Sequence, residues 1–155
     1  MAAADERFRA RAAALGVEVE ARRFPAGTRT AVDAARAVGC DVAQIVKSLV
    51  FIADDQPVLA LTSGANRVDE TKLAAAAGAE RVRKATAEEV RSATGYAIGG
   101  TPPFGHDREL LVLCDRDLAG QELVWAAAGT PMDVFALTGK RLVEAAGARV
   151  VDLAA

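Results

Sequence analysis

Lys47 is the residue whose type and surroundings most strongly suggest chemistry in this sequence. The chain holds 4 lysines against 15 arginines, and the other three lysines occur in polar helical or turn contexts. Lys47 instead lies between apolar residues on both sides, where a helix is expected to give way to a strand. Because burial of an unpaired ammonium group is costly, its head must reach a cleft, a carboxylate or an anionic ligand. The alternative is a stem that carries the charge to the surface beside the sheet.

The second feature is the segment Thr94-Gly-Tyr-Ala-Ile-Gly-Gly-Thr-Pro-Pro-Phe-Gly-His106. Gly99 and Gly100 allow the backbone to approach a ligand and to direct N–H groups at it, as an oxyanion or phosphate site requires. The segment matches neither the P-loop pattern nor the dinucleotide-binding glycine pattern. A tight connection explains it equally well. We expect His106, which follows the turn, to be a solvated or capping residue.

The third feature is the turn Ala126-Ala-Ala-Gly-Thr-Pro-Met-Asp133, which contains Gly129. Pro131 fixes φ in it, so a β-turn between two strands is expected whether or not the turn binds a ligand. Two local groups of basic residues also stand out, because such a group next to a cleft can hold phosphates. These groups are Arg22 and Arg23 with Arg29, and Arg67 with Lys72.

Composition narrows the classes of function. Two distant cysteines, Cys40 and Cys114, and a single histidine exclude a disulfide framework and a Cys/His metal cluster, so we expect no metal and no cofactor. A net charge of −2 argues against extended binding of duplex DNA, whereas recognition of a nucleic-acid end by a local pocket stays open. No apolar run approaches the roughly 18 residues of a membrane span, and charges follow Met1 too early for a secretory signal. We therefore expect a cytoplasmic protein that does not bind membranes.

The pattern of apolar residues and helix caps predicts an α+β fold. Residues 1–155 are expected to form a single domain with a central mixed β-sheet flanked by short helices. Helices are predicted at residues 3–15, 30–38, 69–77, 86–94 and 138–146, with a short one capped by Asp41. Strands are predicted at residues 17–24, 47–53, 58–62, 81–83, 109–114, 122–127, 134–137 and 149–152.

Taken in order, several segments resemble the YbaK-like family, the free-standing relatives of the editing domain inserted in bacterial prolyl-tRNA synthetases. The resemblance runs from about Val17 to Leu142, and the ordered set is more specific than any single motif. The matching segments are Phe24-Pro-Ala-Gly-Thr-Arg-Thr-Ala31, Gln44-Ile-Val-Lys-Ser-Leu-Val-Phe51, Gly64-Ala-Asn-Arg-Val-Asp69 with Lys72-Leu73, Thr94-Gly-Tyr-Ala-Ile-Gly-Gly100 with Pro103-Phe-Gly105, and Trp125-Ala-Ala-Ala-Gly-Thr-Pro131.

The resemblance implies a trans-editing aminoacyl-tRNA deacylase. Such a protein hydrolyses the ester of a small, wrongly attached amino acid at a tRNA 3′ end, with the tRNA for proline favoured. Its partners would be the aminoacyl-tRNA 3′ end and an aminoacyl-tRNA synthetase. Family members resemble substrate-assisted catalysts, in which water is the nucleophile and a ribose hydroxyl helps. Lys47, Gly99 and Gly100 match the family's functional lysine and glycines, and the implied substrate-binding residues are Phe24, Thr30, Thr101, Gly129 and Asp133.

Two departures from the family pattern are visible. Asp133 reaches the place of an aspartate found in some relatives only with a one-residue gap, and Ala127 and Ala128 stand where some relatives carry serine. Three other functions stay open from the residues. They are a non-catalytic module that binds a tRNA end, a nucleotide or a synthetase; a hydrolase of another nucleotide-linked ester or phosphate; and a purely structural interaction protein.

Overall fold

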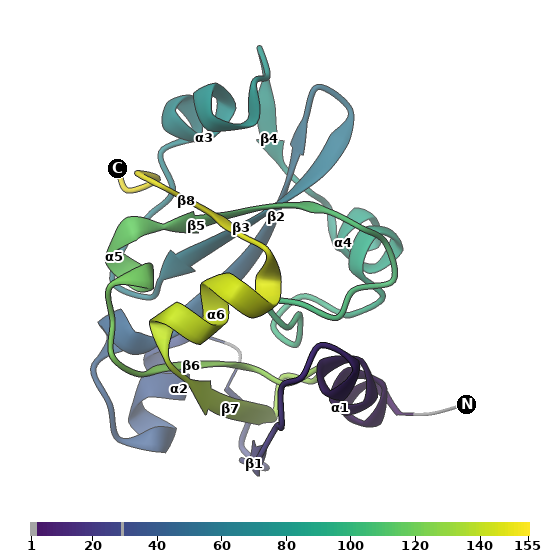
Figure 1. Cartoon of the computed structure of the whole chain (residues 1–155), viewed down its shortest axis with the longest axis vertical. Coiled ribbons are helices and arrows are strands. Elements are labelled where there is room, and N and C mark those ends of the chain that lie inside the picture. Colours follow the sequence, from purple (N-terminus) through teal and green to yellow (C-terminus); the bar gives the residue numbers. More distant parts are fainter. Residues whose placement is uncertain (1–2, 29) are drawn as a thin grey trace.

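A computed structural model describes residues 3–28 and 30–155 (Figure 1). Arg29, one member of the first basic group, lies outside the described residues. The helices are α1 (Ala4–Ala14), α2 (Ala31–Val38), the 3-10 turn η1 (Val42–Gln44), α3 (Glu70–Ala77), α4 (Ala87–Thr94), α5 (Arg116–Ala119) and α6 (Gly139–Ala146). The strands are β1 (Arg22–Arg23), β2 (Val46–Ala53), β3 (Gln56–Ser63), β4 (Val82–Lys84), β5 (Leu111–Asp115), β6 (Val124–Ala127), β7 (Asp133–Leu137) and β8 (Arg149–Val151).

The larger sheet has five strands in the order β4-β2-β3-β5-β8. β2 and β3 form the hairpin that the sequence predicts, closed by Asp54 and Asp55 with φ of 46° and 70°, the left-handed backbone that tight hairpins favour. β4 pairs antiparallel with β2, whereas β3, β5 and β8 run parallel. The sheet is therefore mixed, and the predicted α+β class is confirmed.

A second sheet of three antiparallel strands, in the order β1-β7-β6, lies below the first in Figure 1. A β-bridge between Ile45, just before β2, and Trp125 in β6 links the two sheets. The sequence predicts the strands of this second sheet but not that they separate from the larger one. The prediction of a strand over residues 17–24 is wrong in extent, because only Arg22 and Arg23 pair with β7.

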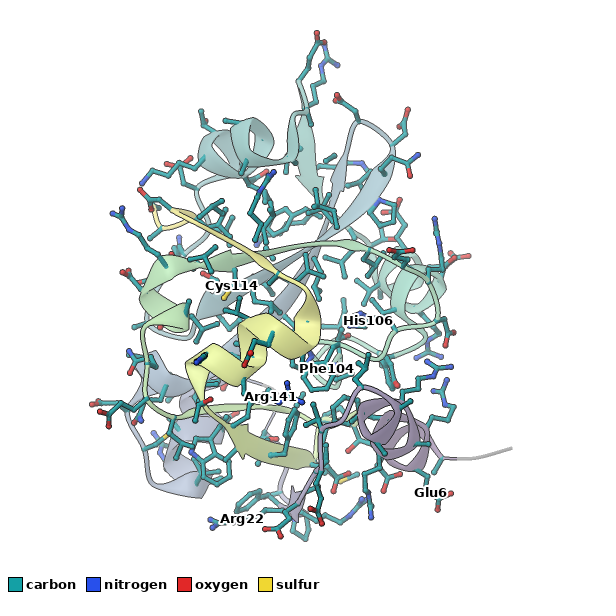
Figure 2. All side chains as sticks on the ribbon, viewed as in Figure 1. Glu6, Arg22, Phe104, His106, Cys114 and Arg141 are labelled. Carbon is teal, nitrogen blue, oxygen red and sulfur yellow. The ribbon has the colours of Figure 1, made fainter. Side chains whose placement is uncertain are left out.

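The five-stranded sheet is covered on both faces, and successive residues of a strand point to opposite faces. One face carries Val46 and Val50 of β2 and packs against α1, α4 and the second sheet. Its centre includes Phe8 of α1 and Phe104, whose rings lie 5.4 Å apart, and Figure 2 shows Phe104 next to α1. The other face carries Phe51 of β2 and packs against α3 and the C-terminal residues, including Leu153. Each side chain of β2 thus lies on one of two faces of the sheet, and each face packs against different elements.

Side-chain caps fix the helix boundaries close to where the sequence places them. Thr30, Asp69, Thr86 and Thr138 each accept backbone N–H groups at the start of a helix, and Gly39, Gly78, Gly95 and Gly147 end these helices in the left-handed region. The short helix after Asp41 ends at Gln44, and Val46 already belongs to β2. Among the described residues, no helix has the length and apolarity needed to cross a bilayer.

Candidate active site

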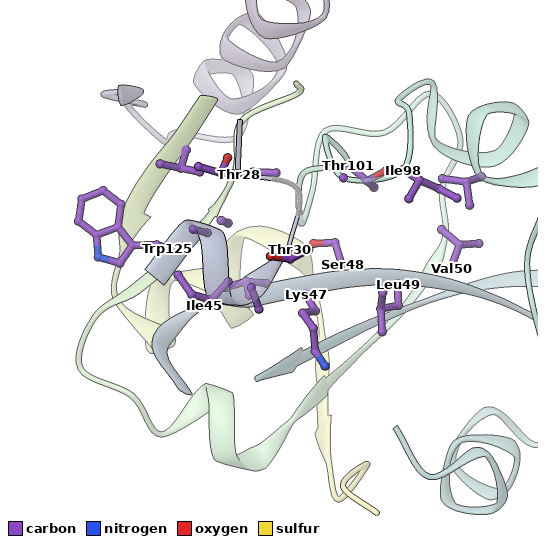
Figure 3. A pocket seen from close by; sticks show the side chains of 18 of the residues that line it. Thr28, Thr30, Ile45, Lys47, Ser48, Leu49, Val50, Ile98, Thr101 and Trp125 are labelled. Atoms are coloured by element: carbon purple, nitrogen blue, oxygen red, sulfur yellow. The ribbon is translucent and has the colours of Figure 1, made fainter. Parts of the chain in front are cut away.

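A cavity of about 430 Å³ opens beside β2, and we refer to it as the β2 cavity (Figure 3). Its walls come from β2, the start of α2, the loop after α4, and β6 with β7. Four of the site residues predicted from the sequence line it: Thr30, Lys47, Gly99 and Thr101. The structure thus brings together the lysine segment and the glycine loop, which are some 50 positions apart in the chain.

The cavity exists because β2 is longer than the strand beside it. β4 pairs with Phe51, Ile52 and Ala53, and residues 46–50 extend beyond this pairing. The Val50 carbonyl accepts the Ala85 N–H on the β4 side. Because backbone groups alternate sides along a strand, the N–H and C=O of Ser48 point to the same side, toward the cavity. This part of β2 offers backbone donors and acceptors to a ligand.

Ser48 also presents its side chain to the cavity, and Figure 3 shows it on the same side of β2 as Thr30 and Thr101. Its hydroxyl oxygen is buried and has no hydrogen-bond partner among the described residues. A buried hydroxyl without a partner costs free energy, which suits a position that meets a ligand. Sequence reasoning missed Ser48, although a serine between Val46 and Val50 on one face of a strand is a visible signal.

Lys47 points away from Ser48 and Thr101, across β2 (Figure 3). Its ammonium group donates to the backbone carbonyl of Asn66. Burial, and after it the nearby charges of Arg67 and Lys84, lower the pKa of Lys47 from the usual lysine value. Lys84 also lines the cavity. Three cations therefore lie around this edge of β2, whereas Lys72, which the sequence grouped with Arg67, is paired with Asp152 at 2.9 Å.

Gly99 and Gly100 have different surroundings in the loop after α4. Gly99 lines the cavity and has φ of 86°, a conformation that side chains rarely adopt. Gly100 lies against the turn at Thr130, where a Cβ atom would come within 2.8 Å of backbone atoms. Its N–H donates to the Ala97 carbonyl at 3.0 Å. The Gly100 N–H is thus bonded within the loop, and the loop residues that line the cavity are Gly99 and Thr101.

The β2 cavity is not lined by three of the predicted residues, Phe24, Gly129 and Asp133. They contact neighbouring segments instead. The Phe24 N–H donates to the Met132 carbonyl at 2.7 Å. Gly129 lies against α1, where a Cβ atom would be 2.7 Å from the Ala4 carbonyl oxygen. Asp133 is 4% exposed and pairs with Arg23 at 3.0 Å. The structure therefore places these three residues outside the cavity lining, and their role in substrate binding stays a prediction.

Neither the histidine nor the cysteines meet the cavity. His106 Nε2 lies 2.7 Å from the Pro102 carbonyl oxygen, and burial lowers the pKa of the ring. Burial raises the pKa of Cys114 to about 12, so its thiol is protonated at neutral pH. Cys40 also has a raised pKa, caused first by burial and then by Asp41. The cavity instead gains residues that the sequence did not single out, among them Thr28, Ile98 and Trp125.

Comparison with known proteins identifies the family of this chain. A model of the aminoacyl-tRNA editing domain matches residues 25–145. The chain belongs to this family. The predicted resemblance to YbaK-like proteins is thereby confirmed, and the matched region contains both the lysine segment and the glycine loop.

The similar proteins include ligases and a solved structure. The proline--tRNA ligase of Ligilactobacillus salivarius is 38% identical over 107 residues, which are 69% of this chain. The proline--tRNA ligase of Streptococcus gordonii is 38% identical over 96 residues, which are 62% of this chain. The matched regions span 18% and 15% of those ligases. A crystal structure described as a candidate trans-editing enzyme for prolyl tRNA synthetase superposes with a TM-score of 0.93 and 44% identity, covering 100% of this chain and 99% of that one. This editing-family chain thus matches that solved structure over nearly the whole of both chains and the ligases over a small part of theirs.

Proposed function

We propose that this chain is a trans-editing aminoacyl-tRNA deacylase, in which residues 1–155 form a single catalytic domain. Its substrate is the ester of a small, wrongly attached amino acid on a tRNA 3′ end, with the tRNA for proline favoured. The observation that carries the proposal is the β2 cavity itself, which has a glycine loop on one side and a cluster of cations at its edge, in a chain of the editing family.

The cavity walls favour a small aliphatic group. Ala31, Ala34, Ala126 and Ala127 line it together with Val50, so the walls are mainly apolar. Hydroxyl groups from Thr28, Thr30, Ser48 and Thr101 are the polar exceptions. A pocket of this kind binds apolar surface and uses a few polar groups to orient the ligand. A methylene group changes binding in such a pocket by about 1–3 kcal/mol, so alanine, cysteine, serine and threonine are all to be tested.

We propose that the residues around the cavity act by positioning the substrate. Lys47, with Lys84 and Arg67 nearby, holds a phosphate of the unpaired 3′ end as a compact positive charge. The backbone N–H groups of Gly99 and Thr101 stabilise the oxyanion that forms when water attacks the ester carbonyl. Water is the nucleophile and a ribose hydroxyl of the substrate assists it. The raised thiol pKa values of both cysteines support this choice over a cysteine nucleophile.

A deacylation panel tests the proposal. Purified protein is incubated with tRNAs charged with alanine, cysteine, serine or threonine, starting with alanyl-tRNA for proline, and loss of the ester is followed in single turnover. Lys47→Ala is expected to slow hydrolysis at least about tenfold, the size of one lost charge-assisted contact. Lys140→Ala, which removes an exposed lysine in α6, is the matched control and keeps the full rate. Binding of uncharged tRNA without any hydrolysis would instead establish the non-catalytic module.

A further inference from the structure

The loop between β3 and α3 holds Lys47 through one residue, Asn66. The Asn66 backbone carbonyl accepts the Lys47 ammonium group. The side-chain nitrogen of Asn66 donates to Asp115 Oδ2 at 2.8 Å and to Asp117 Oδ2 at 2.9 Å. A side-chain amide nitrogen carries two N–H donors, and both have a carboxylate partner here. The orientation of Asn66, and with it the position of the carbonyl that holds Lys47, is therefore fixed by the end of β5 and the start of α5.

The contact with Asn66 is the main interaction of the Asp115 side chain. It is fully buried, at 0% exposed, at the end of β5. It occupies the N-cap position of α5, where an aspartate side chain commonly caps, but makes no side-chain cap bond within the described part of the chain. Its carboxylate turns to Asn66 instead, and its Oδ1 has no partner among the described residues. A buried carboxylate with an unpartnered oxygen costs stability, so the fold alone gives no reason for it.

Asp115 and Lys47 share one face of the five-stranded sheet. Lys47 lies opposite Thr62 in the β2–β3 pair, and Leu61 lies opposite Cys114 in the β3–β5 pair, so Thr62 is next to Asp115. The three residues form a row across adjacent strands, on the face turned away from Ser48. Thr62 is also fully buried, and its hydroxyl has no partner among the described residues. This polar row runs from the buried carboxylate to the functional lysine.

We infer that Asn66 is a positioning residue for Lys47 and that Asp115 anchors it. The inference rests on the proposed function, because it assigns Lys47 its role in holding the substrate. A lysine side chain has four rotatable bonds, and fixing it when substrate binds costs binding free energy. Asn66 fixes the ammonium group beforehand, at the edge of the β2 cavity. Neither Asn66 nor Asp115 contacts the substrate in this arrangement, so both act through Lys47.

A double-mutant cycle separates positioning from a general structural role. Asn66→Ala keeps the backbone carbonyl but removes the two side-chain hydrogen bonds that orient it. It is expected to lower kcat/KM for the mischarged tRNA about tenfold, the size of one charge-assisted hydrogen bond. In a Lys47→Ala background the same change is expected to alter kcat/KM by less than about twofold, because its target is gone. If the effects of the two substitutions on kcat/KM simply multiply in the double mutant, the inference is overturned. An Asn66→Ala protein as active as the wild type would overturn it too. A wild-type protein without deacylase activity would instead overturn the proposed function.

A second measurement does not depend on activity. The chain has 4 lysines, so isotope-labelled lysine gives four sets of side-chain NMR signals, and Lys47→Ala assigns one of them. In the wild type, the two ε-methylene protons of Lys47 are expected to have distinct shifts, as in an immobilised side chain. Asn66→Ala is expected to merge them and to raise the pKa of Lys47 toward the usual lysine value. Unchanged signals would contradict the positioning role whatever the enzyme does.

Asp115→Leu provides the variant that is expected to fold well. Leucine is of similar size and removes a buried carboxylate oxygen that has no partner among the described residues, while Asp117 still accepts an N–H of Asn66. We expect a melting temperature equal to or above that of the wild type, together with a reduced kcat/KM and merged Lys47 signals. Asp152→Asn, which removes a carboxylate paired with Lys72 outside this network, is the control and keeps both readouts. A stable Asp115→Leu protein with wild-type activity would show that Asp115 does not anchor the lysine.

Discussion

Lys47 and Ser48 are neighbours in β2 and face opposite sides of the sheet. Ser48 presents its hydroxyl to the β2 cavity, whereas the Lys47 ammonium group donates to Asn66 across the strand (Figure 3). A ligand that lies along the open edge of β2 therefore meets Ser48 on one side and Lys47 on the other. This arrangement suits a substrate with two chemically different ends, an amino acid in the apolar cavity and a phosphate beside the cations.

Ser48→Ala is expected to separate stability from activity. The Ser48 hydroxyl is buried without a partner among the described residues, so its removal is expected to raise the free energy of unfolding by about 1 kcal/mol. If the hydroxyl orients the substrate, kcat/KM falls at the same time. Urea unfolding and single-turnover deacylation measure the two effects. A destabilised Ser48→Ala protein would mean that the hydroxyl has a partner in the folded state.

The pH dependence of hydrolysis should report on Lys47. Because its pKa is lowered in the folded protein, Lys47 loses its charge at a lower pH than an exposed lysine does. The enzyme-dependent rate is therefore expected to fall as pH rises through this pKa. Lys47→Arg keeps its charge at high pH and is expected to remove this decline, although the rate at neutral pH is lower because the geometry differs. Ester loss without enzyme is subtracted at each pH.

The lowered pKa of Lys47 also determines how the free energy of unfolding changes with pH. Between the folded and the unfolded pKa of Lys47, the unfolded chain binds more protons than the folded one. The contribution of Lys47 to the free energy of unfolding therefore rises with pH across this window, and at neutral pH the charged lysine is a cost. Lys47→Met is expected to be at least as stable as the wild type at pH 7, as urea titration can show. Clear destabilisation at pH 7 would mean that its contact with Asn66 outweighs the cost of burial.

The parts of the fold that depend on short-range contacts could be predicted from the sequence. Thr30, Asp69 and Thr86 cap helices through backbone groups two or three residues away, and the hairpin turn is made by its own two residues. The face on which Lys47 lies depends instead on where β2 begins. Placing the residue at a helix-to-strand junction left that face undetermined, whereas a strand that begins at Val46 sets it by alternation.

Contacts between distant segments were beyond the reach of the sequence pattern. Asn66 and Asp115 are 49 positions apart and meet because β3 and β5 are parallel neighbours. Gly100 was predicted correctly as part of the loop, but its contact with Thr130 arises from the packing of one loop on another. The glycine-loop motif therefore pointed to one wall of the β2 cavity, whereas the different surroundings of the two glycines required the three-dimensional structure.

Gly100→Ala is expected to impair both the fold and the reaction. An added Cβ atom meets backbone atoms of Thr130 at 2.8 Å, and backbone cannot rotate away as a flexible side chain does. We expect a loss of about 1–3 kcal/mol in unfolding free energy and at least a tenfold slower deacylation, because Gly99 and Thr101 move with the loop. Gly120→Ala is the matched control, since its nearest atom lies at 3.5 Å and its backbone is helical. Full activity of Gly100→Ala would show that the loop tolerates displacement.

The single tryptophan of the chain gives a direct signal for binding at the cavity. Trp125 lines the β2 cavity, and the Arg22 guanidinium lies 4.9 Å from the centre of its ring. A ligand at this edge changes the polarity around the indole, so titration with a short RNA that ends in an unpaired CCA is expected to change the fluorescence. The fluorescence change should weaken with added salt, because phosphate contacts to cations contribute to binding. Lys140→Ala, an exposed change in α6, should leave the titration as it is, whereas an unchanged signal in the wild type would place the RNA end away from Trp125.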